Sequence, residues 1–449
     1  MNLIHKFESM GRYILIDVYS GAVHIVSKIV YDIVDDVPNL TDRELIEKYP
    51  HYPEGEITEA AKEIRALMER GELFSPEIEA EDIHYNPQHV IKAMCLNVSH
   101  DCNLRCTYCF ASQGDYDGSR EVMDFETGKK ALDFLVAHSG NRRNLEVDFF
   151  GGEPLMNWEV VKALTLYGEE LNRTKNKNLR FTLTTNGLGL NDEVNAFLNE
   201  HMKNVILSVD GRRDVNDRMR PTANGRGSFD LIVPKIKRFI ESRGDKEYYI
   251  RGTFTANNLD FGEDAKEFHR LGFEKISLEP VVTDPEKSYA LRDEHLPQIL
   301  EEYERFAEDY LEIRKRDKDF LFFHYFIDLD GGPCLAKRSI GCGAGVEYIC
   351  VTPKGEIYPC HQFVGETDFL IGSLDEGITR RDIVEEFQNA NVFTKEECRS
   401  CWAKFYCSGG CHANAYYNNG DLKEPYHLGC MMELKRIECA IGILAQMEE

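Results

Sequence analysis

The chain has 449 residues, of which 42% are hydrophobic, so it is long enough for two or three packed domains. Its 53 basic and 78 acidic residues give a formal net charge of −25, which argues against a nucleic-acid partner. The longest apolar runs are only of strand length, and Met1–Met10 contains no apolar signal region. We therefore expect a cytoplasmic protein without a membrane partner.

Residues 1–85 are expected to form a separate small unit. Tyr13–Val26 predicts a two-stranded hairpin, and three short helices follow. One of these helices, Asp42–Tyr49, begins at the capping-box pair Thr41 and Glu44. A hairpin with three short helices is typical of a winged-helix-like domain. DNA binding is the other use of such a domain, and its acidic pattern opposes that use.

Residues 86–285 alternate strands with helices. The six expected strands are Val90–Val98, Leu145–Phe150, Arg180–Thr184, Val205–Val209, Tyr248–Thr255 and Lys275–Leu278. Repeated strand–helix units require a parallel sheet. The pattern predicts an α/β fold, a partial (β/α)6 TIM-like barrel, with its site at the carboxyl ends of the strands.

The last third of the chain changes character. Residues 286–330 predict a helical connector. Residues 331–449 are turn-rich and contain ten of the fourteen cysteines. Because a cytoplasmic chain keeps its thiols reduced, clustered cysteines indicate metal ligation rather than disulfides. Metal clusters would stabilise a segment with so little regular pattern.

The first cysteine cluster follows the first expected strand of the barrel. It reads Cys102-Asn-Leu-Arg-Cys106-Thr-Tyr-Cys109. A four-iron cluster held by three thiolates has one open iron, which can chelate the amino and carboxylate groups of S-adenosylmethionine. The alternative is a three-cysteine zinc site completed by His100.

This segment resembles the signature of the radical S-adenosylmethionine (SAM) superfamily, including the aromatic Tyr108 before the third cysteine. The resemblance implies that Cys102, Cys106 and Cys109 carry the catalytic cluster. The supporting motif is Gly151-Gly152-Glu153-Pro154 on the next strand, whose backbone and Glu153 bind the SAM amino group in that family.

Further positions match the family pattern less specifically. By resemblance, Ser208 and Asp210 contact the ribose of SAM and Arg220 pairs with its methionine carboxylate. Asn186, in a Thr-Asn-Gly turn after the third strand, is expected near the same pocket. Each of these residues is equally compatible with an ordinary turn or surface role.

The C-terminal cysteines resemble, position for position, the seven-cysteine extension called SPASM. Its members here are Cys342, Cys360, Cys398, Cys401, Cys407, Cys411 and Cys430. The resemblance implies two auxiliary [4Fe–4S] clusters, and so three clusters per chain. One would be held by Cys398, Cys401, Cys407 and Cys430, and the other, nearer the radical site, by Cys342, Cys360 and Cys411. Two zinc ribbons are the alternative use of such pairs.

Two full clusters need eight thiolates, and the motif supplies seven. Cys334 or Cys350 would be the eighth ligand. Otherwise one iron stays open, and a substrate thiolate would bind there in its deprotonated form.

Over nearly its full length the chain resembles the maturases of SCIFF peptides, which are small cysteine-rich precursors. The opening Ile4-His5-Lys6-Phe7 and the run Asp17–His24 carry this resemblance. It implies a sactisynthase-type enzyme that joins a cysteine sulfur to a carbon of an acceptor residue in a ribosomally made peptide. The N-terminal unit would bind the leader of that peptide by adding a strand to its sheet. An unidentified electron donor is also implied.

Two rival classes remain. An anaerobic sulfatase maturase would share the radical core and the cysteine-rich segment, and would form an aldehyde without a leader-binding unit. A non-catalytic zinc-bound peptide chaperone would contain zinc and would not cleave SAM.

Overall fold

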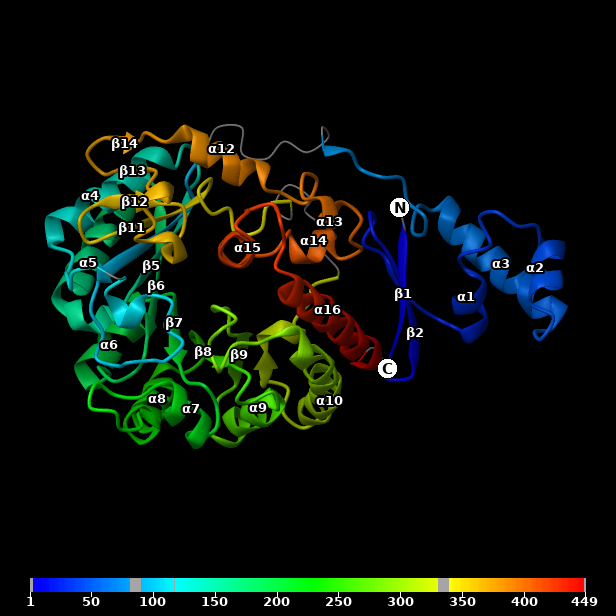
Figure 1. The fold of residues 1–449 in the computed structure, drawn as a ribbon, viewed down its shortest axis with the longest axis horizontal. Coiled ribbons are helices and arrows are strands. Elements are labelled where there is room, and N and C mark those ends of the chain that lie inside the picture. The colour runs from blue at the N-terminus through cyan, green and yellow to red at the C-terminus, as the bar shows by residue number, and fades with distance from the viewer. Residues whose placement is uncertain (1–2, 81–89, 117, 330–338, 448–449) are drawn as a thin grey trace.

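The computed structural model describes residues 3–80, 90–116, 118–329 and 339–447. It contains a three-stranded antiparallel sheet near the N-terminus and an eleven-stranded sheet that forms the body of the molecule. Figure 1 shows the N-terminal elements projecting from the body, with helix α16 between the two.

The N-terminal elements contain the expected hairpin and helices, and one further strand. They are β1 (Ile4–Ser9), β2 (Arg12–Asp17), β3 (Val23–Val26), α1 (Lys28–Ile33), α2 (Asp42–Lys48) and α3 (Glu54–Glu69). The predicted capping box is confirmed, because Thr41 and Glu44 each accept a hydrogen bond from the other's backbone N–H. Strand β1 was missed, and it pairs with β2 along six residues.

The three-stranded sheet is buried on both faces. Leu15 packs with Ile33 and Ile64 of the helices that follow it. Ile14 and Ile16 point to the other face, where they pack against residues of α16 (His427–Met447). The sheet therefore lies between two groups of helices (Figure 1), and a chain segment more than 400 residues away completes its packing.

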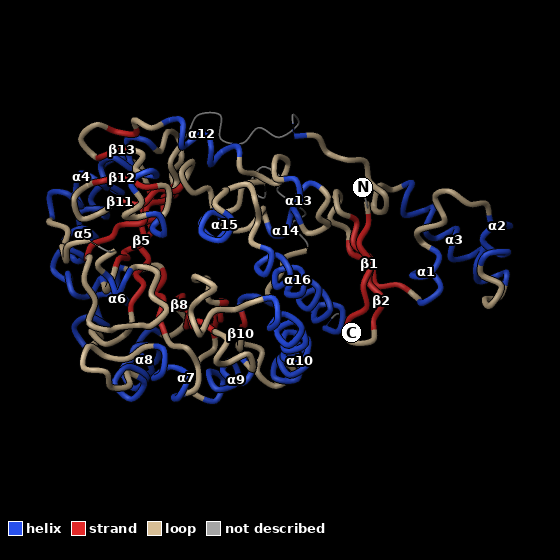
Figure 2. Tube along the Cα trace, viewed as in Figure 1, coloured by secondary structure: helices blue, strands red, loops and turns tan. Residues whose placement is uncertain are grey.

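All six expected barrel strands are present. They are β4 (Ala93–Ser99), β5 (Asn144–Gly151), β6 (Asn178–Thr185), β7 (Asn204–Ser208), β8 (Glu247–Phe254) and β9 (Lys275–Pro280). Each is parallel to the next and lies beside it in sequence order, which confirms the parallel α/β sheet. The connecting helices are α4 (Phe125–His138), α5 (Trp158–Lys175), α6 (Asp192–His201), α7 (Arg213–Met219), α8 (Phe229–Arg243) and α9 (Phe261–Arg270). Figure 2 shows these helices outside the curved run of strands.

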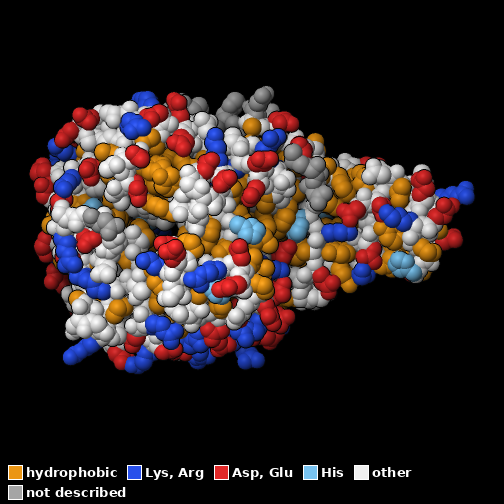
Figure 3. Space-filling view, in the orientation of Figure 1, with side chains coloured by type: hydrophobic (Ala, Val, Ile, Leu, Met, Phe, Trp, Pro, Cys, Tyr) orange, Lys and Arg blue, Asp and Glu red, His pale blue; other side chains and the backbone are white. Residues whose placement is uncertain are grey.

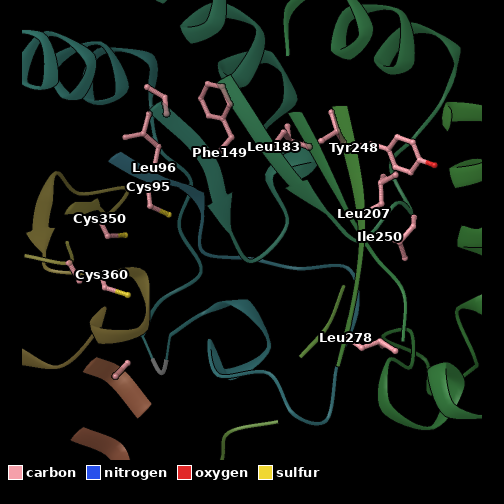
Figure 4. Packing of buried hydrophobic residues seen from close by; sticks show 14 of the residues in the cluster. Cys95, Leu96, Phe149, Leu183, Leu207, Tyr248, Ile250, Leu278, Cys350 and Cys360 are labelled. Atoms are coloured by element: carbon pink, nitrogen blue, oxygen red, sulfur yellow. The ribbon is translucent and has the colours of Figure 1, made fainter. Parts of the chain in front are cut away.

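Alternation along the strands separates two environments. Leu145, Val147 and Phe149 of β5 are buried, and the residues between them are half-buried. The buried side chains pack under the outer helices, as Figure 4 shows for Phe149, Leu183 and Leu207. The intervening residues therefore face the inside of the barrel.

The sheet continues past both edges of this barrel. β10 (Leu321–Phe322) is parallel to β9, and β11 (Tyr348–Val351) is parallel to β4. The outer strands β12 (Glu356–Tyr358), β13 (Gly372–Ser373) and β14 (Gly377–Ile378) are antiparallel. The cysteine-rich segment thus begins inside the same sheet as the barrel.

The rest of the C-terminal part is more helical than its sequence indicates. The expected connector contains α10 (Leu296–Arg314), which packs against α16. The other helices are α12 (Arg381–Asn389), α13 (Glu396–Arg399), α14 (Lys404–Cys407) and α15 (His412–Asn419). Short 3-10 turns are η2 (Ser112–Gly114), η3 (Pro154–Asn157), η4 (Asp293–His295), η5 (Phe323–Tyr325), η6 (His361–Phe363) and η7 (Thr367–Phe369). Helix α16, 21 residues long, corrects the expectation of a wholly turn-rich segment.

The surface is mixed in charge. Figure 3 shows acidic and basic side chains interspersed over one face, with no continuous basic stripe on that face. Of the helices in the described ranges, none combines the length and the apolar character that a membrane crossing needs.

Candidate active site

The first cysteine loop follows the carboxyl end of β4. Backbone hydrogen bonds fix it against the loop after α7: the N–H of Arg105 donates to the carbonyl of Pro221 (2.8 Å) and that of Thr107 to the carbonyl of Met219 (2.8 Å). Leu104 also forms a bridge with Thr222. These contacts hold the cysteine loop against the end of α7 and the residues that follow it.

The three thiols of this loop lie together. Burial raises the pKa of Cys102 to about 12 and that of Cys106 to about 11, and the pKa of Cys109 is raised by the same cause. Thiols in such surroundings lose their protons only to a strong positive centre, such as bound iron. The Leu104 N–H (3.4 Å) and the Asn186 side-chain amide (3.7 Å) point at the Cys102 sulfur, as donors to a ligand thiolate would.

Two glycines, the last residue of β5 and the next one, allow that strand to approach the cysteine loop. A Cβ on Gly151, whose φ is +120°, would lie 2.3 Å from the carbonyl oxygen of Ser99. A Cβ on Gly152 would lie 2.3 Å from the carbonyl oxygen of Asp101, beside Cys102. Only glycine fits at either position.

Glu153 contacts the protein at both carboxylate oxygens. It accepts hydrogen bonds from the Thr185 hydroxyl (2.7 Å) and from the backbone N–H of Asn186 (2.8 Å) and Leu155 (3.0 Å). It is 1% exposed and joins the ends of β5 and β6. Its position therefore orients Asn186 toward Cys102, which the sequence did not indicate.

Tyr108, Asp210 and Arg220 form a hydrogen-bonded triad, in which Asp210 and Arg220 are buried and Tyr108 is half-buried. The Tyr108 hydroxyl donates to the Asp210 carboxylate (2.8 Å), and Arg220 Nη1 donates to the Tyr108 oxygen (2.8 Å). Arg220 lies 3.8 Å from Asp210. Burial raises the pKa of Asp210 to about 6, and the Arg220 guanidinium opposes this shift. Three residues singled out separately in the sequence are thus one unit.

A cavity of about 510 Å³ lies between the carboxyl ends of the strands and the C-terminal segment. Residues predicted from sequence that line it are Tyr108, Ser208, Arg220, Cys407, Cys411 and Cys430. Arg220 Nε is buried and, among the described residues, has no hydrogen-bond partner. An anionic ligand group in the cavity would satisfy it, so the site fits a cofactor carboxylate.

Residues 96–237 match the family model described as Radical SAM superfamily, and this range spans the cysteine loop, the glycine turn and Arg220. This part of the chain therefore matches a radical SAM domain. A Cysteine-type anaerobic sulfatase-maturating enzyme of Clostridium novyi (strain NT) is 27% identical over 342 residues, which cover 70% of this chain and 86% of that protein. A Radical SAM cyclopropyl synthase, TigE, of Paramaledivibacter caminithermalis is 22% identical and covers 72% of this chain and 68% of its own length.

Solved structures share the fold. Native anSMEcpe with bound AdoMet and Cp18Cys peptide has a TM-score of 0.64 at 20% identity, and covers 80% of this chain and 99% of its own. SuiB of Streptococcus suis bound to precursor peptide SuiA has a TM-score of 0.51 at 15% identity, and covers 93% and 96%. The likeness to SuiB therefore includes the N-terminal elements that precede the radical SAM domain.

Opposite the radical SAM cysteines, the C-terminal thiols lie in two sets. Electrostatic interactions connect Cys407 and Cys430 with Cys398, and Cys398 with Cys401. Others connect Cys360 with Cys342 and Cys411. The assignment of these thiols to two clusters stays a prediction. Among the described residues, no three His, Cys, Asp or Glu side chains converge closely enough to hold a single metal ion.

Cys350, a candidate eighth ligand, lies on β11 in the same buried cluster as Cys360. It is paired in register with Cys95 of β4, and both side chains are fully buried (Figure 4). Cys334, the other candidate eighth ligand, lies outside the described residues.

The charged residues at one end of the cavity were not identified from the sequence. Glu279, at the end of β9, accepts a hydrogen bond from Ser277 (2.8 Å) and lies 3.3 Å from His324. Arg436 of α16 lies 2.9 Å from the other ring nitrogen of that histidine. Burial raises the pKa of Glu279, but His324, Arg251 and Arg436 together hold it well below its usual range. Strand alternation would have placed Glu279 and Arg251 inside the barrel, whereas no sequence signal connects Arg436 with them.

Proposed function

We propose that this chain is a peptide maturase that forms thioether cross-links between cysteine sulfurs and acceptor-residue carbons in a cysteine-rich precursor peptide. The observation that carries this proposal is the shared cavity. It is lined by Tyr108 and Arg220 of the radical SAM domain and, on the opposite side, by the thiols Cys407, Cys411 and Cys430. A substrate bound in this cavity would contact the radical SAM residues and the C-terminal thiols at the same time.

In this proposal Cys102, Cys106 and Cys109 hold the radical-generating cluster. Cys398, Cys401, Cys407 and Cys430 hold one auxiliary cluster, and Cys342, Cys360 and Cys411 hold the other. When bound, the first cluster and SAM supply the one-electron cleavage that gives a 5′-deoxyadenosyl radical. Two of these ten cysteines are buried and six are half-buried, which supports cluster ligation, because a bare thiolate is destabilised where water is partly excluded.

The residues of the chain bind and orient. Arg220 Nε is suited to the methionine carboxylate of SAM, with Tyr108 and Asp210 fixing the guanidinium. Ser208 and Asn186, at the ends of β7 and β6, are suited to the ribose and to the cluster sulfur. Gly151, Gly152 and Glu153 shape the turn against which the amino group of SAM would lie.

Three cysteines for the inner auxiliary cluster leave one iron for a substrate thiolate. Cys411 is exposed at the cavity, and the Gln362 amide points at its sulfur (4.0 Å). A substrate cysteine bound beside it would be deprotonated and held near the hydrogen-abstracting centre.

Residues 1–85 are proposed to form the domain that binds the leader of the peptide. The proposed barrel (86–285), connector (286–330) and SPASM segment (331–449) follow it along the chain. Strand β3 is an edge of the three-stranded sheet, and its Ile25 is 43% exposed. A leader strand added to this edge would gain backbone hydrogen bonds and an apolar contact.

A second candidate is an anaerobic sulfatase maturase, which would convert a cysteine to an aldehyde. The relative from Clostridium novyi bears this name. The N-terminal elements favour a precursor peptide as substrate, since SuiB, whose structure holds a precursor peptide, covers 93–94% of this chain and anSMEcpe covers 80%.

Mass spectrometry distinguishes the two. The reconstituted chain is incubated without oxygen with SAM, a reductant and a leader-bearing, cysteine-rich peptide. Thioether formation removes two hydrogens and one alkylatable thiol per cross-link, whereas aldehyde formation replaces the sulfur of one cysteine with oxygen and also removes two hydrogens. An unmodified peptide with released 5′-deoxyadenosine would refute the substrate, and no 5′-deoxyadenosine from intact clusters would refute the radical chemistry.

Single substitutions test the ligand assignment. Cys102→Ala is expected to abolish 5′-deoxyadenosine release together with about four irons per chain. Cys439→Ala is the matched control, because Cys439 is buried in α16 and belongs to neither thiol set. An equal loss of iron and of 5′-deoxyadenosine release in both variants would contradict the ligand assignment.

A further inference from the structure

A buried lysine lies among the C-terminal cysteines without a counter-ion in the described part of the chain. Lys395, just before α13, is 1% exposed. Its Nζ donates to the carbonyl oxygen of Gly409 (2.7 Å), and no described carboxylate forms an ion pair with it. A buried ammonium is costly unless an anion compensates it.

The groups that face Lys395 belong to both thiol sets. Burial lowers its pKa, and thiolates at Cys398, Cys407, Cys411 and Cys430 raise it. Cys411 belongs to the inner set and the other three belong to the outer set. Lys395 is therefore a positive charge positioned between the two.

The hydrogen bond of Lys395 also reaches the turn that connects the sets. Gly409 lies between Cys407 and Cys411, and its φ is +88°. One side chain thus contacts the backbone that separates a ligand of each proposed cluster.

We propose that Lys395 is the shared counter-ion of both auxiliary clusters and raises the reduction potential of each. This inference rests on the proposed function, which supplies the clusters. A cluster becomes more negative when it accepts an electron, and a nearby buried cation stabilises that form.

The proposed reaction requires an electron acceptor, and the charge of Lys395 would favour electron transfer to the auxiliary clusters. In the proposed cross-link a C–H and an S–H bond break and a C–S bond forms. One hydrogen atom leaves with the 5′-deoxyadenosyl radical, a proton leaves to solvent, and one electron must be accepted by an auxiliary [4Fe–4S] cluster. A higher potential makes those clusters better acceptors.

Lys404 provides a matched comparison in the same segment. It is 5% exposed, and its Nζ donates to the Tyr19 hydroxyl (2.8 Å) and the carbonyl of Arg399 (3.0 Å). Among the cluster thiols, only Cys401 contributes to its pKa. Its charge should therefore affect the clusters less.

The test is a redox titration of the full reconstituted chain, followed by electron paramagnetic resonance. Lys395→Gln keeps a donor for Gly409 and removes the charge, whereas Lys395→Arg keeps the charge. We expect Lys395→Gln to make reduction of both auxiliary clusters at least tenfold less favourable, which is about 59 mV for a one-electron couple. Lys395→Arg and Lys404→Gln should each change the equilibrium constant for this reduction by less than threefold.

Unmoved potentials in Lys395→Gln with full iron content would overturn the inference and leave the proposed function intact. Equal iron loss in the Gln and Arg variants would also overturn it, because the role would then be structural. A wild-type chain that binds only about four irons would overturn the proposed cluster content itself.

Thermal unfolding gives a readout that needs no turnover. In the iron-free chain the charge of Lys395 is uncompensated, so Lys395→Gln should raise Tm. In the cluster-loaded chain the same change removes a counter-ion and should lower Tm. A shift of the same sign in both forms would overturn the counter-ion role.

Discussion

At the scale of single residues, Asp148 is a half-buried carboxylate inside the barrel whose ionised form is poorly compensated. It lies on β5 in register with Cys95 and Thr182. One of its oxygens has no hydrogen-bond partner among the described residues. Burial raises its pKa to about 7, and Arg251 only partly opposes this.

This raised pKa predicts a pH-dependent stability. The folded chain holds a proton on Asp148 that the unfolded chain releases near pH 4, so stability falls between about pH 4 and pH 7. Asp148→Asn is expected to remove this fall and to stabilise the protein by about 4 kcal/mol at pH 8, and by nothing below pH 4. Chemical denaturation at both pH values measures the free energy of unfolding of the two proteins. An equal stabilisation by Asp148→Asn at the two pH values would contradict the raised pKa.

Gly152 predicts a steric effect on the cysteine loop. Gly152→Ala would place a methyl group 2.3 Å from the carbonyl oxygen of Asp101, so the loop must move, at a cost of about 1–3 kcal/mol. We expect a lower thermal midpoint and weaker iron binding at the radical site. Gly55→Ala, at the start of α3, is the control, because no atom lies within 4 Å of the position that its new methyl group would take. A Gly152→Ala variant that retains full iron content would contradict this account.

At the scale of elements, α16 connects the two sheets. Ile441 of this helix is 1% exposed and belongs to the cluster that covers Phe7, Ile14 and Ile16 of the N-terminal strands. The helix also packs on α10 of the body. The stability of β1 and β2 therefore depends on the far end of the chain.

Ile441→Ala tests this dependence. The lost packing is expected to cost about 2–5 kcal/mol and to speed hydrogen exchange in β1 and β2. Leu166→Ala, at a 49% exposed position of α5, should leave the free energy of unfolding and the hydrogen exchange of β1 and β2 unchanged. Unaltered exchange in the Ile441 variant would show that the N-terminal sheet is stable without α16.

At the scale of the whole molecule, the N-terminal elements cannot be removed cleanly. A chain that begins at residue 90 would expose Ile437, Ile441 and Ala445 of α16 to water. We expect it to self-associate and to unfold at a lower temperature than the full chain, as sedimentation and calorimetry would measure. Ile25→Pro, at the β3 edge, should instead weaken leader binding without association. A monomeric, equally stable truncated chain would contradict this view.

Local sequence was sufficient for the features whose signals are local. The six barrel strands, the α2 capping box and the spacing of the cysteines all follow from periodicity, side-chain chemistry and turn residues within short windows. The grouping of the C-terminal thiols into two sets came from resemblance, and it stays a prediction.

Tertiary structure alone decided the rest, because those features join residues far apart in the chain. The Tyr108–Asp210–Arg220 triad spans 112 positions, and Arg436 meets His324 across another 112. The burial of the N-terminal sheet by α16 and the lysine between two thiol sets also depend on how separate elements pack. The residues themselves determine which chemistry is available, and the packing determines which of those groups meet, since distance and burial set the strength of each interaction.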